Sequence, residues 1–362
     1  MNARKPIALH VFSTFAVGGP QVRFAALAAH LGDAWRHIIV AMDGNTACRE
    51  RLPPGLDVSF PDIDHRKGAM LGNAWGFRRY LKAWRPDVMV TSNWGSIEWA
   101  MANFLPVVRH IHIEDGFGPE ERTTQLPRRV WMRRIFLRRV QVVVPSLTLR
   151  EIATRVWRLP KPRYVPNGID LERFAVARPG GGAVPVIGTV AALRAEKNLA
   201  RLLRAFRLIA DETKAELMIV GDGPMREDLQ SLAAELGVGA RVRFAGHTDQ
   251  AQDFYRHFDI FALSSDTEQM PLSVLEAMAS GLPVAATDVG DVRAMLAGGN
   301  GGFVVPQDDA RLADALRRLL ADPLSARAIG AANREKAAHD YDQKAMFATY
   351  AALLRGDGSC TP

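Results

Sequence analysis

Cysteine is scarce in this sequence of 362 residues, which contains only Cys48 and Cys360. Two cysteines are too few for a disulfide-stabilised scaffold, so that class of protein is excluded. Such sparse cysteine is typical of a reducing compartment. We therefore expect a cytoplasmic protein.

Long apolar runs are also lacking, since no 18 consecutive residues are apolar and uncharged. This excludes an ordinary transmembrane helix. The apolar stretch 7–12 follows Arg4 and Lys5 but is too short for a signal peptide, and we interpret it as a buried first strand. With 48% apolar and 23% charged residues and no low-complexity tract, global disorder is excluded as well.

Charge is distributed unevenly along the chain. Residues 1–175 carry 26 Lys and Arg against 15 Asp and Glu, a net charge of +11, whereas residues 176–362 carry 20 against 24, a net charge of −4. A length of 362 residues predicts two domains, or three, at about 100–200 residues per domain. The basic half is suited to an anionic partner such as nucleic acid, anionic lipid or an anionic acceptor.

Short β-branched apolar runs alternate with longer helical patterns in both halves. In the first half we predict strands at 7–12, 37–41, 87–91, 107–111 and 142–144, with helices at 21–31, 71–84 and 97–104. In the second half we predict strands at 184–190, 216–220, 242–245, 260–263, 283–286 and 303–305, with helices at 199–209, 226–236, 272–279 and 310–320. The alternation predicts an α/β fold with two doubly wound, Rossmann-like domains, joined near the turn-rich residues 178–182.

Two candidate binding features lie in the first half. The segment Gly18-Gly19-Pro20-Gln21 stands between a predicted strand and a helix, where glycines admit a ligand and the helix N-terminus attracts anions. A plain turn is the alternative, and the dinucleotide spacing G-x-G-x-x-G is missing. His112 follows the predicted strand 107–111, at the edge where open α/β sheets bind ligands. A purely structural histidine is the alternative there.

The second half contains a cationic loop and a pair of carboxylates. Arg194 and Lys197 follow its first predicted strand, a position suited to phosphate binding, although a solvated charged loop has the same composition. Glu268 and Glu276 are eight positions apart, and Pro271 suits the first turn of the helix between them. We expect the amides of residues 272–274 to bind an anion and the carboxylates to accept hydrogen bonds from sugar or ribose hydroxyls. A helix with ordinary polar residues is the alternative.

Taken together, these features resemble the family 4 glycosyltransferases, which are retaining enzymes of the GT-B fold with a cleft between two Rossmann-like domains. The resemblance covers nearly the whole chain and includes Gly18-Gly19, His112, Val-Pro-Asn-Gly-Ile-Asp at 165–170, Arg194 with Lys197, Gly-Asp-Gly-Pro at 221–224, the E-x7-E motif from Glu268 to Glu276, and residues 276–284. One departure is Gln269, where the family usually has glycine. This side chain leaves the choice of donor sugar open.

The resemblance implies a nucleotide-diphosphate sugar as donor, with a UDP-sugar favoured and GDP-mannose as the second candidate. It implies that Arg194 and Lys197 stabilise the leaving diphosphate, that Glu276 binds the ribose, and that His112 reaches the sugar. It further implies that Glu268 and residues Met270, Pro271, Leu272 and Ser273 hold the donor, while Gly18 and Gly19 approach the diphosphate. Neither a metal nor a cofactor is implied.

The resemblance also implies how the chain is divided and what it acts on. Residues 1–175 would form the acceptor-side domain, residues 183–340 the donor-binding domain, and a helix in residues 341–362 would cross back to the first domain. The acceptor would be a glycan or lipid-linked molecule of cell-surface polysaccharide or glycolipid synthesis. A peripheral position on the inner face of the plasma membrane would suit such an acceptor.

Residues 122–139 are rich in arginine, with Arg122, Arg128, Arg129, Arg133, Arg134, Arg138 and Arg139. At 100° per residue the apolar side chains interleave with the arginines on all sides, so the sequence predicts no clean membrane-binding face. Two interpretations remain open. The segment is either a basic patch attracted to anionic lipid or a surface helix whose arginines meet acidic neighbours.

Two other function classes are each compatible with part of the sequence. Sugar-nucleotide 2-epimerases share the fold, but the E-x7-E motif and Asn167-Gly168 argue against them. A nucleic-acid-binding protein would suit the basic half, but no recognised binding module or stacking-aromatic pattern appears.

Overall fold

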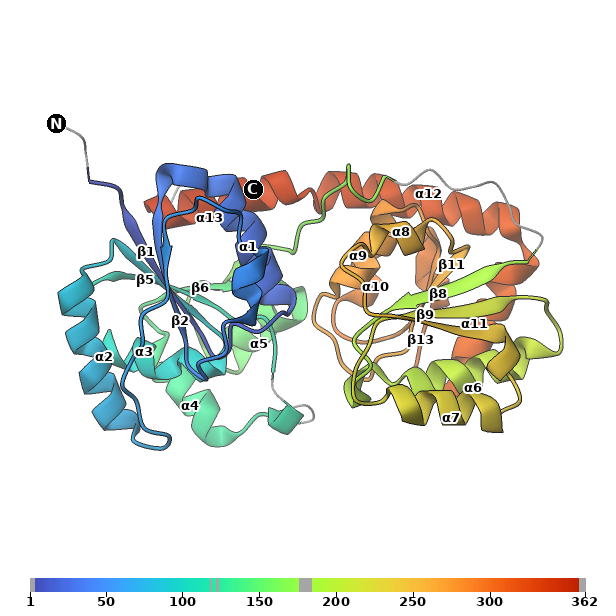
Figure 1. The fold of residues 1–362 in the computed structure, drawn as a ribbon, viewed down its shortest axis with the longest axis horizontal. Helices are drawn as coiled ribbons and strands as arrows, with labels where there is room; N and C mark the ends of the chain where they lie inside the picture. Colours follow the sequence, from blue (N-terminus) through green and yellow to red (C-terminus); the bar gives the residue numbers. More distant parts are fainter. Residues whose placement is uncertain (1–3, 118, 122–123, 176–183, 358–362) are drawn as a thin grey trace. The chain divides into compact units, whose positions relative to one another are not determined.

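The structure is a computed structural model that describes residues 4–117, 119–121, 124–175 and 184–357. The chain divides into two compact units (Figure 1). Unit 1 comprises Met1–Pro166 and Met346–Pro362, and unit 2 comprises Asn167–Ala345. The segment 178–182, predicted as the linker, lies outside the described residues, as do Arg122 and Cys360.

Unit 1 contains a seven-stranded parallel sheet with the order β3-β2-β1-β4-β5-β6-β7. Its strands are β1 (Ile7–Phe12), β2 (Arg36–Ala41), β3 (Val58–Ser59), β4 (Val88–Ser92), β5 (Arg109–Ile113), β6 (Gln141–Val144) and β7 (Arg163–Tyr164). β3 and β7 are two-residue edge strands, too short to show a period of two in the sequence. β5 begins and ends two residues later than predicted, so His112 lies inside the strand instead of after it.

Helices cover both faces of this sheet. They are α1 (Gly19–Leu31), α2 (Met70–Trp84), α3 (Ile97–Ala102), α4 (Pro127–Phe136), α5 (Leu147–Arg155) and most of α13 (Gln343–Arg355). Alternate residues of the central strands face opposite sides, as the pleat requires. Ala8 and Val90 pack with α1 and α13, whereas Leu9 and Met89 pack with α2 and α3.

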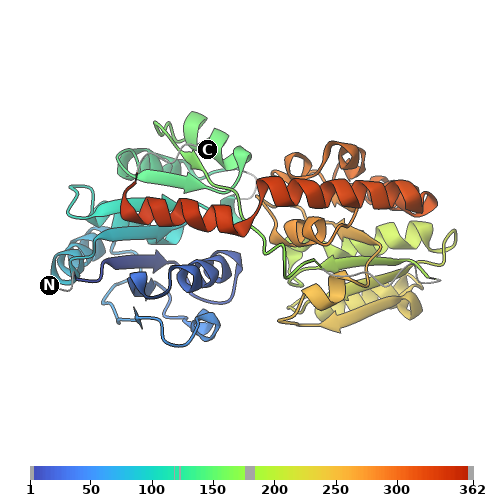
Figure 2. The ribbon, with the colours of Figure 1, turned by 90° about the horizontal axis from the view of Figure 1, so that it is seen from above.

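The last helix, α13, is built to cover unit 1. Its apolar residues recur at helical spacing and are buried, namely Met346, Phe347, Tyr350, Leu353 and Leu354. Figure 2 shows this helix lying over the strands of unit 1. The first three residues of the helix, 343–345, belong to unit 2.

Unit 2 contains a six-stranded parallel sheet with the order β10-β9-β8-β11-β12-β13. Its strands are β8 (Val186–Val190), β9 (Glu216–Val220), β10 (Val242–Gly246), β11 (Ile260–Leu263), β12 (Val284–Thr287) and β13 (Val304–Val305). Its helices are α6 (Leu199–Ala210), α7 (Arg226–Glu235), α8 (Gln252–Tyr255), α9 (Leu272–Ala279), α10 (Val292–Met295), α11 (Asp309–Ala321) and α12 (Pro323–Asp340). α6, α7 and α11 contribute to the core on one face of the sheet, while α8, α9 and α10 contribute to the core on the other.

Strand order places one topological switch point in each unit. In unit 1 the chain runs outward from β1 through β2 to β3 and then returns to β4, on the other side of β1. In unit 2 it runs from β8 through β9 to β10 and then returns to β11, on the other side of β8. The switch points therefore lie between β1 and β4 and between β8 and β11. Open α/β sheets bind ligands beyond the carboxyl ends of the strands at such points. In unit 2 the relevant loops are 191–198, after β8, and 264–271, after β11.

Candidate active site

The two loops at the switch point of unit 2 are joined by an ion pair. Lys197 Nζ donates to Glu268 Oε1 at 2.6 Å, and Ser265 Oγ donates to the same oxygen at 2.8 Å. The Lys197 and Glu268 side chains are 26% and 10% exposed. A ligand can therefore reach a cation and a carboxylate that the sheet topology has placed together.

Arg194 stands in the same loop and begins the short 3-10 turn Ala195–Lys197. It is exposed, and its guanidinium makes no hydrogen bond or ion pair with any described residue. An unpaired guanidinium presents five N–H donors, which suits the binding of a phosphate oxygen pair. The two cations predicted to bind the diphosphate thus differ in their contacts. Lys197 forms an ion pair with Glu268, whereas the Arg194 guanidinium has no partner among the described residues.

Residues that the sequence interpretation missed hold these loops in place. Asp266 Oδ1 accepts from Asn198 Nδ2 at 2.9 Å and from Arg201 Nη1 at 2.7 Å. Arg201 also donates to the carbonyl of Ser264 at 2.8 Å, and Asp266 N donates to the carbonyl of Glu196 at 2.9 Å. The loop after β8 is therefore fastened to the loop after β11 by side chains that need not contact a ligand.

A second set of contacts fixes the backbone around Glu268. Asn167 Nδ2 donates to the carbonyl of Met270 at 3.1 Å, and Asp291 N donates to the carbonyl of Gln269 at 2.9 Å. Gly290 has a φ of +52°, and a Cβ there would lie 2.4 Å from the carbonyl oxygen of Glu268. Asn167 of the Asn-Gly segment thus has a defined role, which is to hold the loop that precedes α9.

α9 begins at Leu272, with Pro271 as its N-cap residue. The amides of Leu272 and Ser273 have no acceptor within the helix, because the first turn lacks preceding carbonyls. Val274 N donates to the carbonyl of Pro271 at 3.2 Å, so the prediction of three free amides at 272–274 is wrong for Val274. Two amides remain for an anion at this helix end.

Glu276, in the second turn of α9, is held by a buried tyrosine. Tyr255 donates from its hydroxyl to Glu276 Oε2 at 2.7 Å and to the carbonyl of Ser273 at 3.1 Å. Burial raises the pKa of Glu276, while the Tyr255 hydrogen bond and nearby Arg173 act against that rise. Burial and the Glu276 charge raise the pKa of Tyr255, so the phenol stays a donor and orients the carboxyl group.

In unit 1, His112 is fully buried among polar partners. Its Nδ1 is 2.8 Å from Thr91 Oγ1, which is also 2.7 Å from His110 Nε2. Its Nε2 is 3.5 Å from Glu114 Oε2. Protein groups therefore stand beside both ring nitrogens of His112, and its contact with a donor sugar stays a prediction.

Glu114 continues this buried network into α4. Arg133, which is 1% exposed, donates from Nε to Glu114 Oε2 at 3.1 Å and from Nη1 to Glu121 Oε1 at 3.3 Å. Burial by itself would raise the pKa of Glu114, but Arg133 and His112 outweigh it and lower that pKa. Arg129 likewise pairs with Glu120 and Glu121. For Arg129 and Arg133, the interpretation in which arginines meet acidic neighbours is confirmed.

Gly18 and Gly19 lie where β1 leads into α1, which begins two residues earlier than predicted. Gly18 is the extended N-cap residue and Gly19 begins the helix. Gln21 Nε2 donates to the carbonyl of Thr14 at 2.9 Å, which closes the turn. A Cβ on Gly95 would lie 2.3 Å from Ser13 Cβ, so the loops after β1 and β4 touch at the switch point of unit 1.

The described residues show neither a metal cluster nor a membrane-spanning helix. Within the described ranges, no group of three or more His, Cys, Asp or Glu side chains is arranged to hold a metal ion. In the same part of the chain, no helix combines the length and the apolar character needed to span a bilayer.

Comparison with known proteins agrees with this architecture. Residues 17–173 match the description "Glycosyltransferase Family 4", and residues 184–322 match "Glycosyl transferases group 1". Glycogen synthase of Mycobacterium tuberculosis is 30% identical over 300 residues, which cover 78% of this chain and 72% of that protein. The GDP-mannose-dependent alpha-(1-6)-phosphatidylinositol monomannoside mannosyltransferase of the same organism is 29% identical over 293 residues, covering 75% and 70%.

Solved structures share the fold. Sucrose-phosphate synthase from Thermosynechococcus elongatus has a TM-score of 0.80 at 22% identity, with 99% of this chain and 100% of that chain covered. Anabaena HepE in complex with UDP and glucose has a TM-score of 0.79 at 18% identity, covering 96% and 99%. The two parallel α/β units and these likenesses identify the GT-B fold. The chain belongs to glycosyltransferase family 4.

Proposed function

We propose that this protein transfers a sugar, with retention of the anomeric configuration, from a nucleoside-diphosphate sugar to a glycan or lipid-linked acceptor. The observation that carries the proposal is the contact of Lys197 with Glu268 at the switch point of unit 2, beside the unpaired Arg194. We assign the product to cell-surface polysaccharide or glycolipid synthesis, and we expect the enzyme to act in the cytoplasm.

The diphosphate binds, in this proposal, to Arg194, Lys197 and the two amides at the start of α9. Negative charge grows on the diphosphate as the glycosidic bond to the sugar breaks. Fixed cations and amide dipoles stabilise that charge most in the transition state. We therefore propose a metal-independent reaction, whose rate should be unchanged in the presence of a divalent-metal chelator.

In this proposal the two carboxylates, Glu276 and Glu268, bind the ribose and the transferred sugar, respectively. Glu276 is oriented by Tyr255 and accepts from the ribose hydroxyls. Glu268 accepts from hydroxyls of the sugar, close to the backbone of Met270 and Pro271. Because Lys197 contacts Glu268, the same lysine can link the sugar site to the diphosphate site.

For unit 1 we keep the predicted roles of Gly18, Gly19 and His112. Replacing His112 by alanine should lower turnover much more than affinity for free UDP, because UDP lacks the sugar. Since His112 is fully buried, the thermal melting midpoint of the variant must be measured alongside. Normal turnover in a folded His112→Ala enzyme would remove the residue from the site.

A thermal-shift panel of nucleotide sugars tests the donor class directly. A ligand that binds only the folded state raises the melting temperature by mass action. We predict the largest shift with a UDP-sugar. The shift with GDP-mannose is the comparison to make, since mannosyltransferase relatives are named as GDP-mannose-dependent.

Product analysis tests the reaction class. Incubation with the shifting nucleotide sugar and candidate acceptors should give a glycoside of the same anomeric configuration as the donor, read by NMR. Release of the nucleotide with an epimerised free sugar would instead favour the 2-epimerase alternative, which the transferase relatives do not support.

A further inference from the structure

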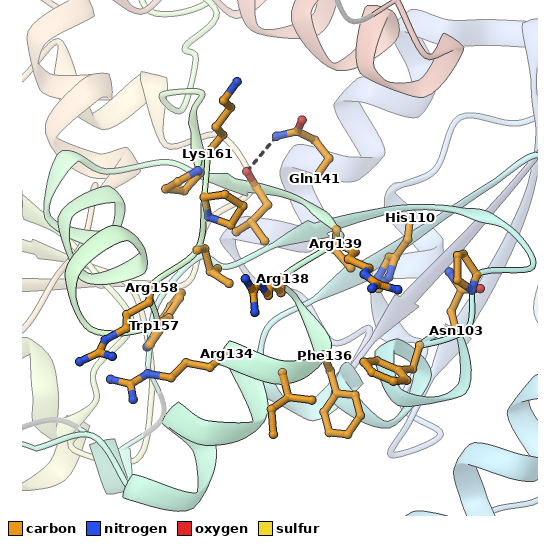
Figure 3. A pocket seen from close by; sticks show the side chains of 18 of the residues that line it. Asn103, His110, Arg134, Phe136, Arg138, Arg139, Gln141, Trp157, Arg158 and Lys161 are labelled. Atoms are coloured by element: carbon orange, nitrogen blue, oxygen red, sulfur yellow. Dashed lines mark hydrogen bonds between the residues drawn. The ribbon is translucent and has the colours of Figure 1, made fainter.

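Unit 1 contains a groove of about 1060 Å³ at the edge of the sheet opposite His112 and Gly18. Arg109 and Gln141, the first residues of β5 and β6, both line it, so it lies at the amino ends of these strands. Its walls come from α4 and from three connections, α3 to β5, α4 to β6 and α5 to β7 (Figure 3). Ligands at a switch point bind at the carboxyl ends, so within unit 1 this groove is separate from His112 and Gly18.

The charges in the groove are all of one sign. Six cationic residues line it, namely Arg109, Arg134, Arg138, Arg139, Arg158 and Lys161. No Asp or Glu occurs among the lining residues in the described part of the chain. Gathering like charges costs free energy unless an anion compensates them.

Only two of these six cations form hydrogen bonds with described residues of the protein. Arg109 donates to the carbonyls of Leu353 and Leu354 at the end of α13, and Arg134 Nε donates to the carbonyl of Val156 at 2.9 Å. The remaining four make no hydrogen bond or ion pair with any described residue, and they are Arg138, Arg139, Arg158 and Lys161. The groove therefore presents four uncompensated cations to the solvent.

The rim of the groove exposes apolar side chains. Trp131 and Ile135, one turn apart on α4, are 60% and 47% exposed. Phe104, Leu105 and Val107 on the α3 to β5 connection are exposed as well. In the folded segment, Met132, Phe136 and Leu137 pack inward, while Trp131 and Ile135 stay exposed among arginines. The prediction that this segment lacks a clean membrane-binding face stays a prediction.

We propose that this groove and its rim form a docking site for the surface of an anionic phospholipid bilayer. Lipid phosphates bind to the four unpaired cations, while Trp131 and Ile135 enter the boundary between headgroups and acyl chains. A tryptophan beside basic residues is the composition found at membrane interfaces. A soluble polyanion would use the cations but would leave the apolar rim uncovered.

Co-sedimentation of the full-length protein with vesicles tests this proposal without any donor or acceptor. We expect binding to vesicles of phosphatidylcholine mixed with phosphatidylglycerol, weakening at high salt, and no binding to phosphatidylcholine alone. Arg138→Glu/Arg139→Glu should reduce the partition coefficient at least about 25-fold, since each basic residue near an anionic surface contributes about fivefold.

Two further variants test whether binding depends on this groove or only on the net charge of the protein. Lys214→Glu/Arg327→Glu makes the same change of net charge at two exposed positions of unit 2 and should leave most of the binding. Trp131→Ser should weaken binding without changing charge. Circular dichroism melting confirms that each variant is folded.

Three results would overturn the proposal. The first is failure of the wild-type protein to bind the anionic vesicles. The second is an equal loss in both double variants, because net charge alone would then explain binding. The third is calorimetric binding of inorganic phosphate or single-stranded DNA that Arg138→Glu/Arg139→Glu abolishes while vesicle binding is unchanged. None of these results bears on donor binding, so the proposed transferase activity is judged separately.

Discussion

Lys197 Nζ and Glu268 Oε1 lie 2.6 Å apart although 71 positions separate them in the chain. The cation expected to stabilise the diphosphate is thus already paired with the carboxylate expected to hold the sugar. In the proposed complex, the donor would share or replace this contact. The sequence analysis predicts separate roles for Lys197 and Glu268, and the structure shows that the two residues are in contact.

Arg194→Ala and Lys197→Ala should each weaken the binding of UDP, or of whichever nucleotide the panel selects, by about tenfold to a hundredfold. The reason is the loss of a charge-assisted hydrogen bond to phosphate, which contributes about 1.5–3 kcal/mol. Isothermal titration calorimetry measures the effect, with Lys214→Ala as an exposed lysine control in unit 2. Unchanged affinity in both variants would show that these residues do not bind the diphosphate.

A double-mutant cycle tests the coupling of Lys197 with Glu268. Once Lys197 is removed, the Glu268 charge remains near the diphosphate without its cation. Adding Glu268→Gln to Lys197→Ala should therefore restore part of the lost affinity, by about three- to tenfold, a coupling within the range for residues in contact. Additive losses would mean that the 2.6 Å contact has no part in binding.

Glu276→Gln should lower affinity for UDP by about tenfold, because a neutral amide accepts more weakly than a carboxylate. The same change should raise the thermal midpoint at neutral pH. Burial raises the pKa of Glu276, so its ionised form opposes folding, and this cost disappears as the pH falls below the ordinary carboxyl range. The stabilisation should therefore shrink in acid, whereas Glu235→Gln, at an exposed position, should show no such trend.

Gly290→Ala should reduce donor affinity at least about tenfold without any contact to the donor. A Cβ at Gly290 would lie 2.4 Å from the carbonyl oxygen of Glu268 and would displace the loop. A misplacement of about 1 Å lowers reaction rates about a hundredfold in well-oriented sites, and we expect a smaller loss of affinity. Gly237→Ala is the matched control, because its φ is also positive, at +69°, but nothing lies within 4 Å of its Cβ position. Both variants should lose some stability, and only the first should lose affinity.

Arg133→Met should destabilise the protein by about 3–5 kcal/mol, because it leaves buried carboxylates without their cation. Urea denaturation measures the loss, with Arg128→Met on the same helix as an exposed control. Arg133 and His112 lower the pKa of Glu114, so the stability that they contribute is present above the ordinary carboxyl range and is lost as the pH falls. The difference in stability between the wild-type protein and Arg133→Met should therefore become smaller in acid.

Regular elements of unit 2 were predicted closely from the sequence. β9, β11 and α9 have the predicted bounds 216–220, 260–263 and 272–279. Their signal is local, since a buried parallel strand is a short apolar run and a helix repeats its apolar residues every three or four positions. α12, in contrast, was missed, because its alanines are spread around the helix and leave no clear periodic face.

The candidate site was predicted in its residues but not in its contacts. The positions of Arg194, Lys197, Glu268 and Glu276 follow from strand ends and motif spacing. Their partners do not, since Tyr255 is 21 positions from Glu276 and Asn167 is 103 from Met270. Which side chains meet over such separations depends on how the strands are ordered in the sheet.

The sequence by itself determined the alternation of strands and helices, the two parallel sheets and the family, because these depend on hydrophobic period and on motifs of adjacent residues. Tertiary structure decided that Lys197 pairs with Glu268, that His112 is buried, and that arginines of one segment divide between buried ion pairs and an open groove. The physical reason is that burial and pairing are properties of surfaces brought together by packing. Adjacent residues of a helix point about 100° apart, so Arg133 enters a buried ion pair while Arg134 lines the groove. Which neighbour each of them meets depends on how the helix packs.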